Sequence, residues 1–375
     1  MAQNIGQRLE RLRSRRHGTD RTTVLSEDAR RAVFASAVNR ETWQDRATGQ
    51  HTRWVLGAMQ AVDPDYTRVS METGNRVANQ LRTRLEANGR KPEFRLQGSV
   101  PLDIHIRGVS DVDLLALDSY LTFDPRGGLA LVNGYGPASV PTSINVLSAL
   151  RQESEEALRA AFPAAKVDTA GSKAIKIHGG SLARPVDVVP SHWHDTIDYQ
   201  RSREDADRAV TILDKSAPRT LDNMPFKHIQ LIKARCHGTG GSLRKSIRLC
   251  KNVKAELEAD GRAVSLSSFD IASIMYDADG AALARGQYFE LAILAETQRH
   301  LDYLWNNKDH ARQLWVPDGT RRIFDSEEKF DGLLALSTEL DDLTREVWKE
   351  QNPYANTASG MLPSYRSSLS QVTIR

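Results

Sequence analysis

The stretch FRLQGSVPLDIHIRGVSDVDLLALD, residues 94–118, decides the fold and the chemistry that we expect of this chain. A short apolar run leads to Gly98 and Ser99, and Asp111-Val-Asp113 comes later, directly before a run of leucines. Two carboxylates at i and i+2 of a strand project from the same face and can bind one or two divalent cations together. A Gly-Ser pair offers a backbone that approaches a phosphate closely and a hydroxyl that binds it. The stretch therefore predicts a metal and nucleotide site on a strand that continues into a core.

Bulk composition fits a soluble protein of two domains. The chain has 375 residues, of which 26% are charged and 40% hydrophobic, and its net charge is +3. This mild positive charge suits small anionic ligands and falls short of a strongly basic nucleic-acid binder. Two cysteines, Cys236 and Cys250, are too few for a disulfide framework or a cysteine-rich zinc site. We find no apolar run of the roughly 18–20 residues that a membrane span needs and no signal-like N-terminus, so we expect a cytoplasmic protein.

Composition and periodicity divide the chain into four segments. A basic, helix-permissive leader precedes a core of mixed strands and helices, and a nearly all-helical lobe and a flexible tail follow. The leader is either a solvated helix or a basic arm for nucleic acid. We expect an α+β fold, in which a mixed-sheet catalytic core is joined to a helical C-terminal lobe. The expected bounds are 1–62 for the leader, 63–220 for the core, 221–350 for the helical lobe and 351–375 for the tail.

One long helix is expected to bridge the two lobes. Asp63 is a suitable helix cap, Pro64 is suited to the first helical position, and Gly89 is a suitable stop after about Asn88. Apolar residues every fourth position give this helix one stripe for packing. The other expected elements are a helix at 143–161, a strand pair at 166–178, a short β-rich run at 184–190 and an irregular crossing between the lobes at 191–224.

Asp187 is the third carboxylate of the predicted site. It lies among the valines of the run at 184–190, where its side chain can meet the first pair. Three carboxylates can hold two Mg²⁺ ions about 3.5–4 Å apart. Taken alone, Asp187 fits equally well as a strand-end cap or a salt-bridge partner, and the first pair fits a solvated edge. Two other Asp-x-Asp triplets, at 205–207 and 277–279, lack a hydrophobic strand after them.

A Gly-Ser pair, a spacer, a strand Asp-x-Asp and a later lone Asp together resemble the polymerase-β-type nucleotidyltransferases. The sequence VDVVP at 186–190 and the helical second half are similar to the bacterial cyclic GMP–AMP synthase-like enzymes, the CD-NTases of anti-phage signalling. This resemblance covers residues 64–300, and its narrower part rests on IRLCKNVKAEL and LSSFDIASIMY. It implies an enzyme that joins NTPs, ATP among them, into a cyclic di- or trinucleotide second messenger for a downstream effector.

The resemblance also assigns roles to single residues. It implies that Asp111, Asp113 and Asp187 are catalytic and bind Mg²⁺ or Mn²⁺, with Asp187 near the acceptor hydroxyl. The nucleotide-binding residues that it implies are Gln97, Gly98, Ser99, Lys251, Ser268 and Phe269. Lys251 and Ser268 would hold the triphosphate, and Phe269 would stack a base.

These roles have plainer alternatives. Lys251 also fits a surface lysine, and Phe269 fits the core of the helical bundle. Arg244, Lys245 and Arg248 lie on the same helix as Lys251. They either add positive charge to the cleft between the lobes or face solvent, and we expect them to face solvent.

Two other functions remain open from the sequence. The runner-up keeps the chemistry but transfers a single nucleotide onto tRNA, protein or a small molecule, as toxin-type relatives do. The other is a nucleotide-sensing scaffold without turnover. The vertebrate relative grips DNA with a zinc-binding insertion that two lone cysteines cannot build, so no DNA activator is expected. Base choice, ring size, linkage and trigger are left open by the sequence.

Overall fold

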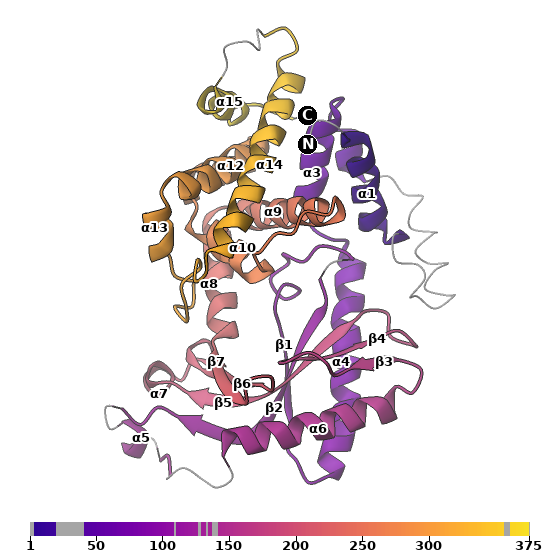
Figure 1. Cartoon of the computed structure of the whole chain (residues 1–375), viewed down its shortest axis with the longest axis vertical. Helices are drawn as coiled ribbons and strands as arrows, with labels where there is room; N and C mark the ends of the chain where they lie inside the picture. Colours follow the sequence, from indigo (N-terminus) through magenta and orange to yellow (C-terminus); the bar gives the residue numbers. More distant parts are fainter. Residues whose placement is uncertain are drawn as a thin grey trace.

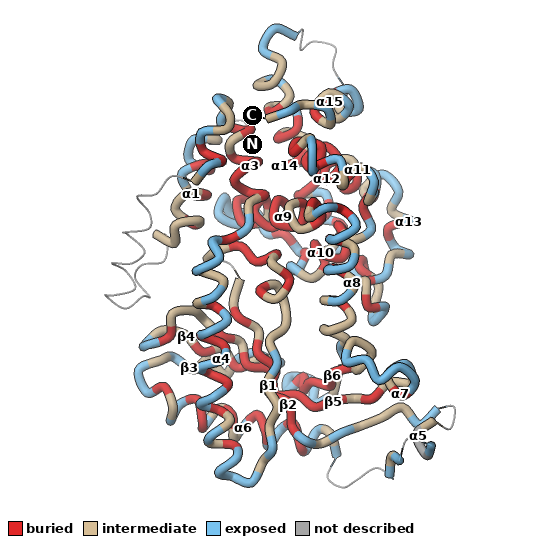
Figure 2. The backbone as a smooth tube through the Cα atoms, turned by 180° about the vertical axis from the view of Figure 1, so that it is seen from behind, coloured by how far each residue is buried: buried red, intermediate tan, exposed pale blue. Residues whose placement is uncertain are grey.

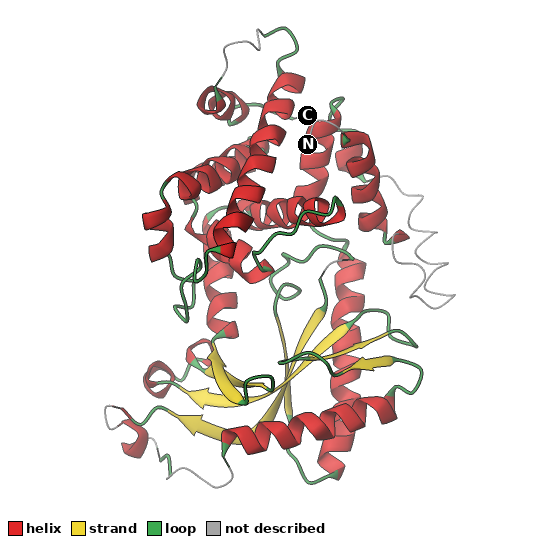
Figure 3. Cartoon of the chain, viewed as in Figure 1, coloured by secondary structure: helices red, strands yellow, loops and turns green. Residues whose placement is uncertain are grey.

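The computed structural model describes residues 4–19, 41–108, 110–126, 129–132, 134–136, 142–355 and 361–374. These residues form two lobes, one with a sheet and one built from helices (Figure 1). The seven strands of the sheet all lie in one lobe (Figure 3). Buried residues line the interior of both lobes (Figure 2). The predicted α+β fold is confirmed.

The sheet lobe is organised around one parallel pair of strands, β2 and β5. The neighbouring strands pair antiparallel to them, in the order β1-β2-β5-β4-β3, and β6 and β7 extend from the second half of β5. The central pair therefore has neighbours on both sides. The strands are β1 (Glu93–Gln97), β2 (Val112–Phe123), β3 (Lys166–Asp168), β4 (Ile175–His178), β5 (Val186–Asp195), β6 (Ala209–Asp214) and β7 (Arg219–Asn223).

Two helices, α4 (Pro64–Ala87) and α6 (Ser143–Ala161), pack together against the sheet. The Asp63 carboxylate accepts hydrogen bonds from the first-turn amides of α4, and Gly89 follows its C-terminus with a φ of +84°. Leu81 of α4 and Leu147 of α6 share a core cluster with the central strands. The expected cap and end of α4 and the expected bounds of α6 are confirmed.

Helix α4 joins the two lobes as a connection. It follows α3 (Gln50–Met59) of the helical lobe after a short link. Its buried apolar side chains, however, belong to the core cluster of the sheet lobe. The expected bridge between the lobes is therefore limited to the short segment between α3 and α4. The apolar stripe of α4 packs in the core of the sheet lobe.

The helical lobe includes the described helices of the N-terminal leader. Leu12 of α1 (Ile5–His17) and Trp54 of α3 are fully buried in the same core as Leu249. Arg15 of α1 donates a hydrogen bond to the buried Glu256 carboxylate at 2.7 Å. Arg8 also forms ion pairs with acidic residues of this lobe. The leader is thus neither a solvated helix nor a free arm over its described part.

No helix in the described ranges is long and apolar enough to cross a membrane. The remaining helices of the helical lobe are α8 (Pro225–Gly238), α9 (Ser242–Ala259), α10 (Ser268–Asp277), α11 (Gly280–Ala284), α12 (Leu291–Asn306), α13 (Lys308–Gln313) and α14 (Glu328–Gln351). The helical lobe also holds the short helices η2 (Thr42–Gln44) and η5 (Arg285–Gln287), and the sheet lobe holds α5 (Leu129–Val132), α7 (Ile197–Ser202) and η4 (Asp205–Asp207).

The irregular crossing predicted at 191–224 is wrong, because this segment holds the second half of β5 and strands β6 and β7. Its polar residues are bonded to one another inside the lobe. Thr211 donates to the Asp222 carboxylate at 2.6 Å, and Asp195 accepts from Arg208 at 2.7 Å. A strand whose buried positions include polar side chains that bond to one another lacks the hydrophobic alternation by which strands are predicted.

The flexible tail predicted at 351–375 is wrong over residues 361–374. Helix α15 (Leu362–Leu369) packs on α12 and α14. The Tyr365 ring lies 4.2 Å from the Trp348 ring, and Leu369 is fully buried. Two apolar residues four apart are enough to dock one face of this otherwise polar helix.

Replacing Leu369 with alanine tests whether α15 belongs to the folded lobe. Loss of a fully buried leucine is expected to lower the free energy of unfolding by about 2–5 kcal/mol in urea titrations. The matched control is Leu334→Ala on α14, since the Leu334 side chain is 38% exposed. Equal, small effects of both substitutions would show that the α15 segment is not part of the cooperative fold.

Candidate active site

The parallel register of β2 and β5 places two of the three predicted carboxylates side by side. Asp113 is the register partner of Asp187, and Gln97 on β1 is the partner of Asp113 on its other side. Lys176 on β4 is in turn the partner of Asp187. Register partners on adjacent strands point to the same face of a sheet. Gln97, Asp113, Asp187 and Lys176 therefore form one row across four strands.

Asp111 joins this row from the residue just before β2. The amide of Val112 donates to the Pro185 carbonyl at 3.1 Å, which fixes the start of β2 beside the start of β5. The Lys176 ammonium forms an ion pair with Asp111 and lies 3.7 Å from Oδ1 of Asp187. The structure thus brings all three predicted carboxylates to the same end of the parallel pair.

The pKa values of Asp113 and Asp187 are raised at this end of the sheet. Burial, followed by the negative charges of Asp187 and Asp111, raises the pKa of Asp113 to about 7. Burial also raises the pKa of Asp187 to about 6, although the Lys176 charge opposes the shift. The charges of Asp187 and Asp111 thus disfavour ionisation of Asp113, and a cation would relieve this repulsion.

The residues present suit a divalent cation that prefers oxygen ligands. Oδ1 of Asp187 is buried without a hydrogen-bond partner, and the Lys176 ammonium already stands where a cation would be shared. As the side chains are arranged, no three His, Cys, Asp or Glu residues of the described chain enclose a metal ion. The donor chemistry therefore fits Mg²⁺ or Mn²⁺, and in this structure the Lys176 ammonium is paired with two of the three carboxylates.

Gly98 and Ser99 open a turn at the end of β1, directly beside the carboxylates. Gly98 has a φ of +76°, and a Cβ atom there would overlap the Asp113 carboxylate. The Ile104 amide donates to the Ser99 carbonyl at 3.1 Å and closes the turn. Glycine is therefore required at position 98 for both backbone geometry and space. The Gly-Ser pair begins this turn and not a regular helix.

Helix α9 holds the middle and the C-terminal end of the loop between β1 and β2. The Lys251 ammonium donates to the Ile104 carbonyl at 2.9 Å and to Ser110 Oγ at 3.2 Å. Arg248 donates to the carbonyls of Met59 and Asp103. Both side chains are nearly fully buried. The expectation that Arg248 faces solvent is wrong, because carbonyl oxygens of the loop satisfy its guanidinium.

Burial lowers the pKa of Lys251 to about 7, while the Asp113 carboxylate favours its charged form. Lys251 therefore lies at the lobe boundary, within electrostatic reach of Asp113, and the alternative of a surface lysine is wrong. Its hydrogen bonds go to the loop before Asp111, so in this structure it positions that loop. A direct contact of Lys251 with phosphate remains a prediction.

Ser268 and Phe269 lie at the start of α10. Ser268 is exposed, and Phe269 is half-buried against the helical core. The His228 ring stacks on Phe269 at 4.3 Å, and the Arg321 guanidinium lies 5.4 Å from the same ring. No hydrogen bond or ring contact in the described chain joins either residue to the three carboxylates. Their predicted roles with nucleotide therefore gain no support from geometry.

Sequence reasoning missed Lys176, Ser110 and the anchoring role of Arg248. Lys176 is preceded and followed by fully buried isoleucines, Ile175 and Ile177. A lysine between buried residues of a strand was the available signal, because its side chain must point to the face opposite theirs.

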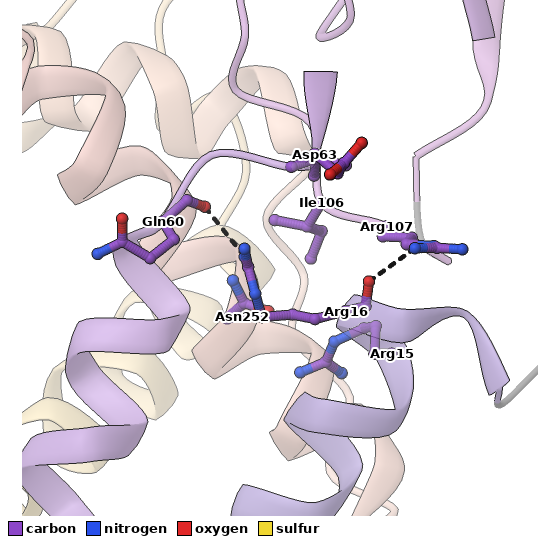
Figure 4. A pocket seen from close by; sticks show the side chains of 8 residues that line it. Arg15, Arg16, Gln60, Asp63, Ile106, Arg107 and Asn252 are labelled. Carbon is purple, nitrogen blue, oxygen red and sulfur yellow. Dashed lines mark hydrogen bonds between the residues drawn. The ribbon is translucent and has the colours of Figure 1, made fainter. Parts of the chain in front are cut away.

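A small pocket, lined by none of the three carboxylates, lies between the end of α1 and the loop before β2 (Figure 4). Arg16 donates to the Gln60 carbonyl at 3.3 Å, and Arg107 donates to the Arg16 carbonyl at 2.8 Å. These bonds tie the leader helix to the lobe junction. None of the predicted site residues lines this pocket, so it belongs to the packing of the leader.

Known proteins resemble the chain over nearly its whole length. The profile of the cGAS/DncV-like nucleotidyltransferase C-terminal helical domain matches residues 230–348. The cyclic dinucleotide synthase CdnE of Yersinia aleksiciae is 43% identical over 356 residues, which cover 92% of each chain.

Two solved structures extend the likeness to three dimensions. The STING-associated CdnE c-di-GMP synthase of Capnocytophaga granulosa matches with a TM-score of 0.68 and 26% identity, over 91% of this chain and 97% of that one. The Rhodothermus marinus CdnE c-UMP-AMP synthase, solved with Apcpp and Upnpp, matches with a TM-score of 0.55 and 18% identity, over 79% of this chain and 98% of that one. The second match shows a shared fold alone.

Replacing Asp113 with asparagine tests the crowding of carboxylates. The folded-state pKa of about 7 exceeds the ordinary value of 3.8, so the native state holds the proton more tightly. The contribution of Asp113 to the free energy of unfolding therefore falls as the pH rises from about 3.8 to about 7 in metal-free buffer. We expect Asp113→Asn to gain roughly 1–2 kcal/mol at pH 8 and little at about pH 4, near the ordinary pKa of an aspartate, measured by urea unfolding with EDTA.

The control for this experiment is Asp309→Asn on α13, because the Asp309 side chain is fully exposed. It should unfold like the unmodified protein at both pH values. A metal-free Asp113→Asn protein that is no more stable than wild type at pH 8 would contradict the crowding of the three carboxylates.

Proposed function

This chain belongs to the cGAS/DncV-like nucleotidyltransferases, and we propose that it joins two nucleoside triphosphates into a cyclic dinucleotide. It is an enzyme of the nucleotidyltransferase type, as are the named relatives. The observation that carries the proposal is the pairing of Asp113 with Asp187 on β2 and β5, with Asp111 and Gly98 beside them. This arrangement combines a place for cations with a turn that phosphates can approach.

The chemistry of each transfer follows from the proposed product. A ribose hydroxyl attacks the α-phosphorus of a nucleoside triphosphate, the new phosphodiester bond forms, and the bond to pyrophosphate breaks. The hydroxyl proton leaves to a nearby base. A second transfer within the linear intermediate closes the ring. No oxidant, reductant or further substrate is needed.

We assign the carboxylates to the metal ions of this reaction. Asp111, Asp113 and Asp187 would hold Mg²⁺ or Mn²⁺, which when bound activates the attacking hydroxyl and neutralises charge on the leaving pyrophosphate. Asp187 stands at the far side of the row from the Gly98 turn, so we place the acceptor hydroxyl next to Asp187 and the donor phosphates next to Gly98 and Ser99. Gln97 lies beside Asp113 on the donor side.

The helical lobe contributes residues of α9 and α10 to the proposed site. Lys251 and Arg248 hold the loop that carries the donor side, so we assign both to positioning the phosphate-binding turn. Ser268 and Phe269 form the candidate base platform at the start of α10. His228 and Arg321 lie against the Phe269 ring, and one of them would have to move before a base stacks there.

Coverage of the relatives favours cyclisation over a single transfer. The Yersinia protein named a cyclic dinucleotide synthase aligns with 92% of this chain, including the helical lobe. Closing a ring requires the enzyme to hold two nucleotides and then the linear intermediate. A protein with two lobes can contact these ligands from two sides. The product would act on a downstream effector, and we place this signalling in the cytoplasm, where nucleoside triphosphates are supplied.

Product analysis tests the proposal. The protein is incubated with all four NTPs and Mg²⁺ or Mn²⁺, and the products are treated with phosphatase and identified by mass. We expect a phosphatase-resistant cyclic dinucleotide, and its masses identify the bases. Label that moves to RNA, with no cyclic species, would favour the alternative of a single transfer and defeat the proposal.

Substitution of Asp187 by asparagine links that product to the site. Because neutralising one carboxylate removes both a metal ligand and its charge, we expect at least a roughly 100-fold loss of product formation. Asp309→Asn, which changes the same side chain at an exposed position, should retain full activity. Retention of activity by Asp187→Asn would remove this residue from the catalytic set.

A further inference from the structure

Lys176 carries a charge that the proposed reaction does not use. Its ammonium forms an ion pair with Asp111 and lies 3.7 Å from Oδ1 of Asp187. The register of β4 and β5 places Lys176 directly across from Asp187. The lysine therefore bridges two of the three carboxylates from the side opposite Asp113.

The backbone of Lys176 is fixed, whereas its side chain can leave the carboxylates. Ile175 and Ile177, on either side, are fully buried in the core of the sheet lobe. The Lys176 side chain is 43% exposed, compared with 22% for Asp111 and 23% for Asp187. A long flexible stem with access to solvent allows the ammonium to swing away without disturbing the strand.

Charge arithmetic explains why a cation is needed at this place. Asp111, Asp113 and Asp187 contribute three negative charges when ionised, and Lys176 returns one positive charge. Two unit charges about 4 Å apart interact by several kcal/mol at the effective dielectric constant of a protein surface. A metal-free protein with no such lysine would lose the ion pairs of Asp111 and Asp187, and the buried Lys251 charge would still act on Asp113.

We propose that Lys176 is a resident counter-cation, which occupies the metal position of the free enzyme and must be displaced before a divalent ion binds there. This inference rests on the proposed function, because it takes the three aspartates as the metal ligands. The ammonium and a metal ion between Asp111 and Asp187 exclude each other by space and by like charge. Lys176 therefore weakens binding of the bare metal and favours metal that arrives with a nucleotide, whose phosphates then attract the freed ammonium.

Binding of Mn²⁺ alone tests this proposal. Free and bound Mn²⁺ are distinguished by electron paramagnetic resonance, without nucleotide, for the wild-type protein and for Lys176→Met, which keeps the stem and removes the charge. We expect Lys176→Met to bind Mn²⁺ at least about tenfold more tightly. Lys176→Arg, which retains the charge, should bind like wild type. Lys166→Met, an exposed lysine on the neighbouring strand β3, is the matched control and should also bind like wild type.

Thermal unfolding separates this role from a structural one. Without its counter-cation, Lys176→Met should melt at a lower temperature than wild type in EDTA and recover with Mg²⁺, so that its Mg²⁺-dependent shift exceeds that of wild type. A purely structural lysine would lower the melting temperature equally at every metal concentration. Lys176→Gln provides a second uncharged variant if methionine impairs folding.

The possible outcomes distinguish this inference from the proposed function. Unchanged or weaker Mn²⁺ binding by both uncharged variants, together with loss of binding in Asp113→Asn, would overturn the role of Lys176 and leave the metal site intact. Mn²⁺ binding that is insensitive to Asp113→Asn, even with ATP present, would instead overturn the proposed site itself.

Discussion

The in-register parallel pairing of β2 and β5 is the constraint on which the site depends. It places Asp113 beside Asp187, and Asp111 and Lys176 meet at the same end of the strands. Burial, and after it the charges of neighbouring carboxylates, raises the pKa of Asp113 and of Asp187. The neighbouring residues on both strands are buried leucines and valines, so the strands cannot slip to separate the carboxylates without exposing the core. A stable sheet thus holds three carboxylates close together in spite of their mutual repulsion.

The helical lobe contributes to this site through buried cations of α9. Lys251 and Arg248 bind carbonyl oxygens of the loop between β1 and β2, and that loop carries Ser110 just before Asp111. The arginines of α1 in turn form ion pairs with Glu256 of α9 and with Asp260, which follows it. A chain of contacts therefore runs from the N-terminal helix through α9 to the residue before Asp111. Relative movement of the lobes would act first on the loop between β1 and β2, because residues 103, 104 and 110 of that loop are bonded to α9.

The sequence predicts the parts of this structure that depend on local patterns. The caps of α4, the ends of α6 and the three carboxylates follow from short-range signals such as Asp63-Pro64 and Asp-x-Asp before leucines. Tertiary pairing determines what the sequence could not predict. The strands within 191–224 were missed because residues such as Thr211 and Asp195 satisfy one another inside the lobe. The docking of α15 through Leu369, the burial of Arg248 and the place of Lys176 each depend on a partner far away in the sequence.

The most direct test of the account is a crystal structure with Mn²⁺ and a non-hydrolysable nucleoside triphosphate, in which anomalous scattering locates the metal. The account predicts anomalous peaks among Asp111, Asp113 and Asp187, a triphosphate against the turn at Gly98 and Ser99, and the Lys176 ammonium moved off Asp111. Metal bound elsewhere, or a nucleotide bound with Lys176 still bridging Asp111 and Asp187, would contradict it.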